Sequence, residues 1–505
     1  MDKRVIGALC CALWVLSSGC SDECVDQFDC RADNGQPAEG QEWVCEDNKC
    51  KQRPIPTTPE PDAGEPEPDA GVPDAGVPDA GVPDAGEPDA GEPDAGPVDG
   101  GGMGTAGKGE TCAGSGDCMA GLRCEGAPLT CQAQHVAVTG RDDAGVSKAL
   151  VMRYDTPGMT ALSDGDVDSR YPRWGPGGTR VSFAQGAVDT ATEKVAGDLT
   201  VRDIPLVAGQ AQVLADGGSG NTESFRSMEW APSSYIAWVR QNGSSRSGIS
   251  VVSTDAAGGV VTQATTTGAF PDWAPDGTTF VYNISGEGLL TSTLGAAPTP
   301  LTSAGTSAEQ AHYNHTNAQL LFLANPNNET VVFSGDPIPV PLFKLHSVNV
   351  TGGAQPQLIA DVSSEAATDG TVNTFIASPI WSPDGTWSAY VRAYYFKPTT
   401  GDAVLCGGAP SPCETRPGNV IFLRAINPAD GTATGAEVRL ADDGTLPSFS
   451  PDGRFIAFIK AGQLHVQQID PATGAPVNAA IVHPKGGYTL QTSDSDDHRP
   501  RWQPR

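Results

Sequence analysis

From about Gln134 onward, apolar and polar residues alternate in short runs that turn-forming residues separate. A period of two places successive side chains on opposite faces of a strand, so the pattern predicts half-buried β-sheet. The run from Phe270 to Tyr282 shows the unit: a segment ending at Trp273, a Pro-Asp-Gly turn and a second apolar strand. Proline and aspartate open such a turn and glycine adopts a positive φ, so the unit predicts a β-hairpin.

This hairpin returns along the chain at intervals of tens of residues. Close copies read Trp-Ser-Pro-Asp-Gly at 381–385 and Phe-Ser-Pro-Asp-Gly at 449–453, whereas other copies have lost part of the turn. Two further apolar segments follow each hairpin, for example 249–252 and 259–261. The repeat therefore predicts a four-stranded antiparallel sheet, the blade of a β-propeller. The marker aromatics that end the first strands are Trp174, Trp230, Trp273, Tyr313, Trp381, Phe449 and Trp502.

These hairpins resemble the repeats of TolB-like propellers, the PD40 or WD40-like family, over residues 134–505. The resemblance implies an all-β propeller in a bacterial lipoprotein. TolB-like propellers usually have six blades and follow an α/β domain. No helical periodicity in this chain supplies such a domain, so a role with the Tol-Pal system is not carried over.

The two ends of the repeat region predict how the ring closes. The last copy stops after its first strand at Trp502, and strand-like segments at 135–138, 149–154 and 159–162 precede the first hairpin. One strand from the C-terminal side and three from the N-terminal side complete one blade, which removes a free sheet edge. We therefore predict seven four-stranded blades, with six as the alternative.

The N-terminal residues predict export. Residues 1–19 combine a short charged start with about a dozen apolar residues, a stretch too short to span a membrane and typical of a signal peptide. Small residues before Cys20 resemble the bacterial lipobox, although Leu16 lies one place further away than usual. We predict that Cys20 carries a lipid anchor. The alternative is an ordinary signal peptide, with Cys20 in a disulfide.

Two short segments, 20–53 and 107–133, are rich in cysteine and poor in aliphatic residues. Neither can build a core alone, and an even set of cysteines in an exported protein predicts disulfides. Zinc is the alternative, but neither segment contains a C-x-x-C pair or a histidine. Both loosely resemble small cysteine-rich repeats of bacterial surface lipoproteins. The disulfide candidates are Cys24, Cys30, Cys45, Cys50, Cys112, Cys118, Cys124 and Cys131, together with Cys406 and Cys413 in an insertion of the propeller.

Residues 54–106 predict a disordered linker between the two cysteine-rich segments. Pro-Asp-Ala-Gly occurs seven times between 61 and 96, a composition typical of an extended, self-repelling spacer. Weak calcium binding by its aspartates is the less favoured alternative. The whole chain has a net charge of −30 at pH 7, which argues against nucleic-acid binding.

Two acidic clusters are the candidate metal ligands. Each directly precedes a Pro-Arg-Trp sequence, so each is expected in a loop that enters an innermost strand, and their blades are adjacent. Calcium takes six to eight oxygen ligands, which two such loops could supply. The alternatives are solvated turns whose aspartates cap backbone amides, and pairing of the aspartates with the nearby Arg170, Arg173, Arg499 and Arg501. No other cofactor is expected, and His312 and His315 lack an evident third ligand. The clusters are Asp164, Asp166 and Asp168, and Asp494, Asp496 and Asp497.

No catalytic residues are predicted, because the chain has neither a G-x-S-x-G elbow nor a glycine-rich phosphate loop. Long loops at 325–341 and 395–420 are expected on the same face as the acidic clusters, and binding sites are commonly built on such loops. We therefore predict a monomeric outer-membrane lipoprotein, facing the periplasm or the cell surface, that binds an envelope protein or glycan. The alternatives are a propeller lyase or hydrolase with its site in the axial funnel, and a structural envelope component without a ligand.

Overall fold

The computed structural model describes two compact units, Met1–Glu92 and Pro93–Arg505. In the first unit, β1 (Gln41–Glu46) and β2 (Lys49–Pro54) form an antiparallel hairpin in which Cys45 and Cys50 are register partners. Cys20, Cys24, Cys30 and the linker repeats lie outside the described residues, so the predictions made for them stay predictions. Among the described residues, no helix has the length and apolar character needed to cross a membrane. The described residues are 41–46, 49–54 and 104–505, without 190–193, 207–210, 218–223, 243–244, 256–260, 285–286, 303–306, 315, 317–318, 335, 351–354, 408–411, 414 and 493–496.

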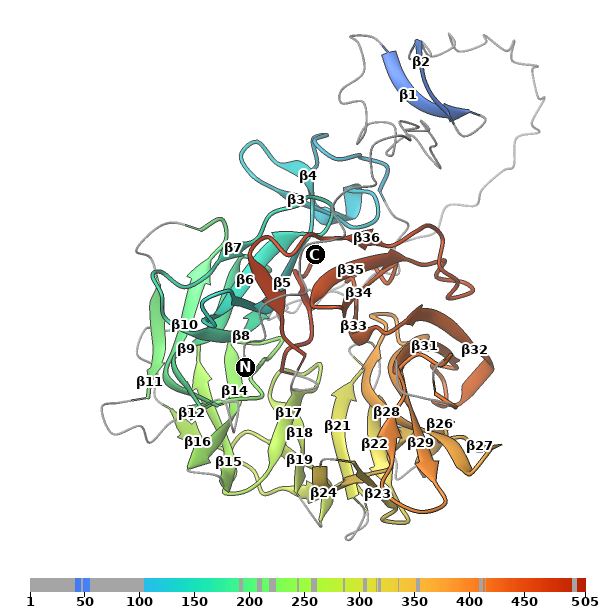
Figure 1. Ribbon diagram of the computed structural model, residues 1–505. Coiled ribbons are helices and arrows are strands. Elements are labelled where there is room, and N and C mark those ends of the chain that lie inside the picture. Colours follow the sequence, from blue (N-terminus) through green and yellow to red (C-terminus); the bar gives the residue numbers. More distant parts are fainter. Residues whose placement is uncertain are drawn as a thin grey trace, which may run out of the picture. The chain divides into compact units, whose positions relative to one another are not determined.

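The second unit contains a seven-bladed β-propeller, and Figure 1 shows the blades arranged around a common centre. From the inner to the outer strand, blade 1 consists of β8 (Ser169–Trp174), β9 (Arg180–Asp189), β10 (Lys194–Asp203) and β11 (Gln212–Asp216), with β12 (Ser224–Phe225) against β10. Blade 2 consists of β13 (Glu229–Trp230), β14 (Tyr235–Asn242), β15 (Ser245–Ser253) and β16 (Thr262–Gln263). Blade 3 consists of β17 (Ala269–Trp273), β18 (Thr279–Ile284), β19 (Gly288–Thr293) and β20 (Thr299–Pro300).

Blades 4 and 5 carry additional strands. Blade 4 consists of β21 (Ser307–Tyr313), β22 (Gln319–Asn325), β25 (Lys344–Asn349) and β26 (Gln357–Ala360), with an inserted hairpin of β23 (Thr330–Phe333) and β24 (Asp336–Pro341). Blade 5 consists of β28 (Gly370–Trp381), β29 (Trp387–Pro398), β31 (Asn419–Ile426) and β32 (Ala433–Asp442), with β27 (Ser364–Ala367) and β30 (Val404–Leu405) at its edges. Blade 6 consists of β33 (Thr445–Phe449), β34 (Phe455–Lys460), β35 (Gln463–Gln468) and β36 (Ile481–Val482).

Blade 7 joins the two ends of the repeat region. It contains β5 (His135–Asp142), β6 (Ser147–Arg153) and β7 (Thr160–Ala161), and β37 (Tyr488–Leu490) and β38 (Arg501–Trp502) both pair with β5. Arg501 lies opposite Ala137, and Trp502 lies opposite Val136. This confirms the predicted closure with seven blades rather than six.

The innermost strands share a positive backbone φ that the sequence pattern did not predict. In six blades, the residue three places before the marker aromatic has a positive φ although it is not glycine. The register of the ladder shifts at this point in five of them, as in a β-bulge. Proline follows the strained residue in four blades, and its missing N–H removes no ladder hydrogen bond there. The residues are Tyr171, Ser227, Phe270, Gln310, Ser378 and Leu446, with φ between 48° and 61°.

The marker tryptophans of blades 1, 3, 5 and 7 each link their blade to the one before it. The acceptor in each case is the backbone carbonyl of the residue directly before the marker of the preceding blade. Trp230 departs from this pattern, because its buried Nε1 has no hydrogen-bond partner among the described residues. In these hydrogen bonds the indole Nε1 donates to a backbone carbonyl: Trp174 to Arg501 (2.9 Å), Trp273 to Glu229 (3.1 Å), Trp381 to His312 (3.0 Å) and Trp502 to Ser448 (3.1 Å).

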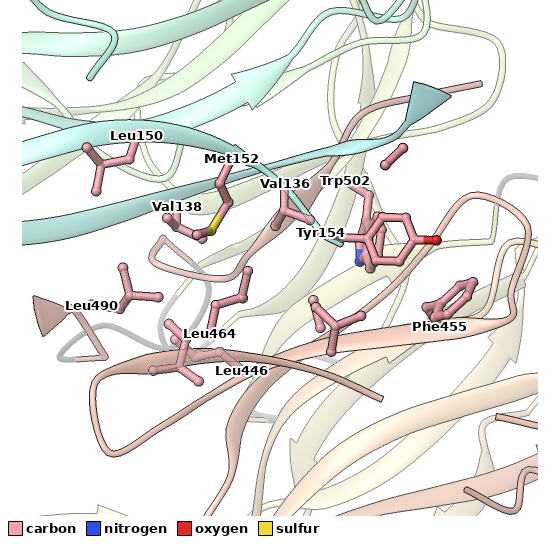
Figure 2. Packing of buried hydrophobic residues seen from close by; sticks show 14 of the residues in the cluster. Val136, Val138, Leu150, Met152, Tyr154, Leu446, Phe455, Leu464, Leu490 and Trp502 are labelled. Atoms are coloured by element: carbon pink, nitrogen blue, oxygen red, sulfur yellow. The ribbon is translucent and has the colours of Figure 1, made fainter. Parts of the chain in front are cut away.

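The second cysteine-rich segment packs on the propeller and is held by disulfides. It comprises the 3₁₀ turn Ser115–Asp117, β3 (Leu122–Glu125) and β4 (Thr130–Ala133). Cys112 pairs with Cys124 and Cys118 with Cys131, so of the three pairings open to four cysteines the structure has this one. Two of these cysteines share a core with blades 6 and 7, part of which Figure 2 shows around Tyr154, Phe455 and Trp502.

One glycine of this segment allows the close approach. Gly121 has a φ of +71°, and a Cβ there would lie 2.5 Å from the Tyr154 hydroxyl and 2.9 Å from the Phe455 ring. Its N–H also donates to Asp452, the aspartate of the Pro-Asp-Gly turn in blade 6. The repeat motif therefore also holds the cysteine-rich segment in place.

Replacing Trp381 by Phe tests the link between blades. The change leaves the His312 carbonyl without its indole donor, and we expect it to lower the free energy of unfolding by about 1–3 kcal/mol. Trp230→Phe is the matched control, because its Nε1 has no partner to lose. Urea unfolding of both variants measures the difference, and equal losses would contradict the role given to the indole donors.

Candidate functional site

The long loops of blades 4 and 5 fold together on one face of the propeller. This is the face that carries the loops entering the innermost strands, and we call residues 326–342 and 399–418 the crest. Phe333 and Ala403 form a parallel bridge between the two loops, and Ser334 N–H donates to the Ala403 carbonyl at 2.8 Å. The sequence predicted that these loops share a face. It did not predict that they contact each other.

The crest has its own small core and a disulfide. Tyr395 and Ala403 are buried in this core, and the Phe333 and Tyr395 ring centroids lie 5.4 Å apart. Cys406 and Cys413 are joined, as the sequence suggested. Two apolar side chains of β30 remain outside the core: Val404 is 39% exposed and Leu405 is 51% exposed. The described residues of the crest thus form a small packed core with apolar groups on its outside.

The residues directly before the marker aromatics bring charge to the centre of the ring. Glu229 Oε1 accepts hydrogen bonds from Arg173 Nε at 3.1 Å and from Arg501 Nη2 at 2.7 Å. Asp497 Oδ2 lies 3.3 Å from Arg226 Nε, and its Oδ1 lies 3.8 Å from Arg173 Nη2. We call these five residues the axial centre, because they join blades 1, 2 and 7.

Two members of the axial centre are almost completely buried, and the other three are 15–17% exposed. The side chains of Arg173 and Asp497 are 3% and 1% exposed. Burial lowers the pKa of Arg173, and the nearby Arg501 lowers it further, whereas Glu229 and Asp497 oppose the shift. A guanidinium remains protonated at physiological pH even so, so the centre is a set of mutually compensating charges.

The segment that closes the ring also fills its centre. Arg499 is almost completely buried, and it donates to the Pro447 carbonyl at 2.5 Å and to the Pro379 carbonyl at 3.1 Å. The ring of His498 packs against Tyr171, with centroids 5.2 Å apart. Residues 497–501 therefore reach blades 1, 2, 5 and 6 from one short stretch.

The cavity beside this segment is small. Its volume is about 10 Å³, and its polar lining includes Ser227, Glu229, Gln310, His312 and Asp497. Such a volume holds about one water molecule. Arginine, histidine and carboxylate groups do converge on the axis: Arg173 and Arg226 contact Asp497, Arg499 donates to backbone carbonyls, and the cavity beside them is very small.

The predicted acidic ligands do not assemble among the described residues. Asp164 pairs with the buried Arg202 at 3.1 Å, and Asp168 Oδ1 accepts a hydrogen bond from Ser147 N at 2.7 Å. Asp166 is exposed, and Asp497 turns into the axial centre. Asp494, Asp496 and His315 lie outside the described residues.

Within the described part of the chain, three or more side chains of metal-ligating type come close only at Cys112, Cys118 and Cys131, which are in disulfides. The contacts of Asp164 and Asp168 are those expected for pairing and capping in turns. The calcium site stays a prediction.

Comparison with known proteins identifies no family for this chain. No protein family and no curated protein sequence matches this chain. A structure from Agrobacterium tumefaciens assigned as TolB is similar over 61% of this chain and 90% of its own, with 14% identity and a TM-score of 0.35. The periplasmic gluconolactonase of Pseudomonas aeruginosa is similar over 71% of this chain and 98% of its own, with 13% identity and a TM-score of 0.41. Oligogalacturonate lyase from Vibrio parahaemolyticus is similar over 68% of this chain and 83% of its own, with 12% identity and a TM-score of 0.39. The structural neighbours thus include TolB and other propellers, and the fold assignment rests on the seven blades themselves.

Replacing Asp497 by Ala tests the axial centre. The change leaves Arg173 and Arg226 without one carboxylate in a buried setting, so we expect a loss of about 3–5 kcal/mol in the free energy of unfolding. Asp442→Ala is the control, because its pair with Arg439 is exposed and should contribute less than about 1 kcal/mol. Similar losses in the two variants would contradict a structural role for the axial centre.

Proposed function

We propose that the propeller is a binding scaffold for an envelope protein or glycan, and that the crest is its binding surface. The observation that carries the proposal is the packed core of the crest, beside which a disulfide joins Cys406 and Cys413 in the same loop. Binding is commonly built on loops that a rigid scaffold positions. The exposed Val404 and Leu405 supply apolar contact area at the outside of the crest.

The axial centre supports binding over the lyase or hydrolase alternative. A catalytic acid, base or nucleophile must reach a substrate atom within hydrogen-bonding distance. The described axial charges instead contact one another and the backbone of neighbouring blades, next to a cavity of about 10 Å³. Their arrangement is that of groups holding the ring together.

A groove between blades 1 and 2 supports binding over a purely structural role. Its volume is about 460 Å³, within the range of roughly 300–1,000 Å³ that is typical of ligand sites. A structural component without a ligand would need no such groove.

The proposal includes the cellular setting. In it, Cys20 carries lipid chains, residues 54–106 act as the spacer, and the protein is a monomeric outer-membrane lipoprotein facing the periplasm or the cell surface. The support is the apolar run of residues 5–16, the small residues before Cys20 and the Pro-Asp-Ala-Gly repeats.

A photo-crosslinker in place of Leu405 tests the crest. With p-benzoylphenylalanine at this position, we expect irradiation of intact cells to give a discrete adduct on denaturing gels, because the side chain would lie in the interface. A second change, Val404→Asp, should weaken the adduct by placing a charge next to it.

The matched control is the same photo-crosslinker in place of Val482, which is 50% exposed on β36 of another blade. Equal adducts at both positions, or none at Leu405, would refute the crest as the binding surface. Digestion of the adduct with protease or glycosidase then distinguishes a protein partner from a glycan.

Metabolic labelling with a palmitate analogue tests the anchor. The wild-type protein should take up the label and fractionate with membranes. Cys20→Ala should abolish both, because the acylated thiol is gone. Cys24→Ala, four residues on, is the control and should label normally. Labelling that persists in Cys20→Ala rejects lipidation at this residue.

A further inference from the structure

The groove between blades 1 and 2 lies on the face of the tight hairpin turns, which is the face opposite to the crest. It has a volume of about 460 Å³. The blade 1 turn, residues 175–179, forms one wall together with Arg180. The other wall belongs to blade 2 and consists of Trp230, residues 232–234, Thr254 and Asp255. No group of the crest or of the axial centre lines it.

The groove lies where two consecutive copies of the hairpin lack the aspartate. Residues 175–178 read Gly-Pro-Gly-Gly, and residues 231–234 read Ala-Pro-Ser-Ser. In blade 3, Asp276 Oδ1 accepts hydrogen bonds from the N–H groups of Thr278 and Thr279 at 2.8 and 2.7 Å. Such a carboxylate fills and closes the turn, so the two turns without it leave a more open surface between them.

Trp230 is placed differently from the other marker tryptophans. Its ring packs against the backbone of Gly175, where a Cβ would lie only 3.0 Å from Cζ2. The Arg180 guanidinium lies 5.9 Å from the centre of the ring. The indole Nε1 does not hold a carbonyl of blade 1, in contrast to the tryptophans of blades 1, 3, 5 and 7. Trp230 thus packs on blade 1 and lines the groove, but it does not donate a hydrogen bond to a carbonyl of blade 1.

The polar groups of the groove surround this aromatic surface with charges of both signs. Arg180 donates to Gln212 Oε1 at 3.0 Å and lies 3.7 Å from the exposed Asp203. Asp255 is exposed at the other wall, and Thr254 and Ser234 add hydroxyl groups. One guanidinium and one carboxylate in the lining favour neither an anion nor a cation.

The lining matches the two sides of a sugar ring. A pyranose has an apolar face of C–H groups, which pack on an indole, and an edge of hydroxyls, which both donate and accept hydrogen bonds. Asp255 accepts from such hydroxyls and Arg180 donates to them. A peptide strand would need a row of free main-chain groups, and these walls are short turns, Gly-Pro-Gly-Gly in blade 1 and Ala-Pro-Ser-Ser in blade 2.

We propose that this groove binds a segment of a neutral glycan, with Trp230 as the packing surface and Arg180 and Asp255 as hydrogen-bonding groups. This site goes beyond the binding surface proposed for the crest and does not depend on it. A glycan held here would leave the crest, on the opposite face, accessible to its own partner.

Titration of the full-length protein with tetrasaccharides tests the site. The probes are cellotetraose, maltotetraose and chitotetraose, with tetragalacturonate as the acidic comparison, and calorimetry measures the dissociation constants. We expect at least one neutral probe to bind at millimolar or lower concentration. Trp230→Ala should weaken that binding by about tenfold or more, in line with the weight that buried aromatic residues carry in binding sites.

Asp255→Asn keeps the test informative if Trp230→Ala fails to fold, because Asp255 is exposed and Asn retains its shape. It should weaken binding by about three- to tenfold, the effect of one charged hydrogen-bond partner. Asp442→Asn, in an exposed pair on blade 5, should leave the affinity unchanged.

Three results would each overturn the proposal. They are no binding of any neutral probe at millimolar concentration, tighter binding of tetragalacturonate than of every neutral probe, and affinity that Asp255→Asn leaves unchanged. None of them bears on the crest, since the crosslinks from Leu405 are measured on the other face.

Discussion

The contact between neighbouring blades is the constraint on which the rest of this protein depends. A single four-stranded sheet has two apolar faces, and each face must be covered by the next blade around the ring. The marker tryptophans strengthen this contact in a directional way, because Trp174, Trp273, Trp381 and Trp502 donate to a carbonyl of the preceding blade. Each such hydrogen bond holds two innermost strands together and fixes the distance between them. Where the bond is missing, at Trp230, a groove opens.

The segment before the last strand explains how the ring is kept closed. Pairing of β38 with β5 removes the free edge of blade 7. The same segment places Asp497 between Arg173 and Arg226, and Arg499 on carbonyls of blades 5 and 6. Charges in a dry site are costly unless they are paired and hydrogen-bonded. These groups therefore specify one arrangement of the blades around the axis.

A ring held in this way leaves its variable chemistry at the two faces. On one face, the crest gathers two long loops around Phe333 and Tyr395. On the other, the turns of blades 1 and 2 leave the groove at Trp230. Both features arise where the repeat is interrupted, by insertion in the first case and by loss of the turn aspartate in the second. Departures from the repeat are thus the better guide to function than the repeat itself.

The sequence by itself determined the all-β fold, the seven blades and the joint blade 7, because hairpin turns and alternating strands are local patterns. It also placed Cys406 and Cys413 in one loop. It could not choose among the pairings of Cys112, Cys118, Cys124 and Cys131, since that choice depends on which strands lie side by side.

Only the tertiary structure decided which charges meet on the axis. Glu229 and Arg501 both stand directly before a marker aromatic, although 272 residues separate them, but the repeat does not show which of these positions meet. The sequence offered Asp497 either as a metal ligand or as a partner of nearby arginines, and in the structure it is buried against Arg173 and Arg226. The groove also depends on the tertiary structure. The sequence shows two hairpin turns that lack the aspartate, but the site forms only because these two turns lie side by side in the folded ring. Local patterns determine strands and turns, whereas sites made of several strands exist only once the ring has closed.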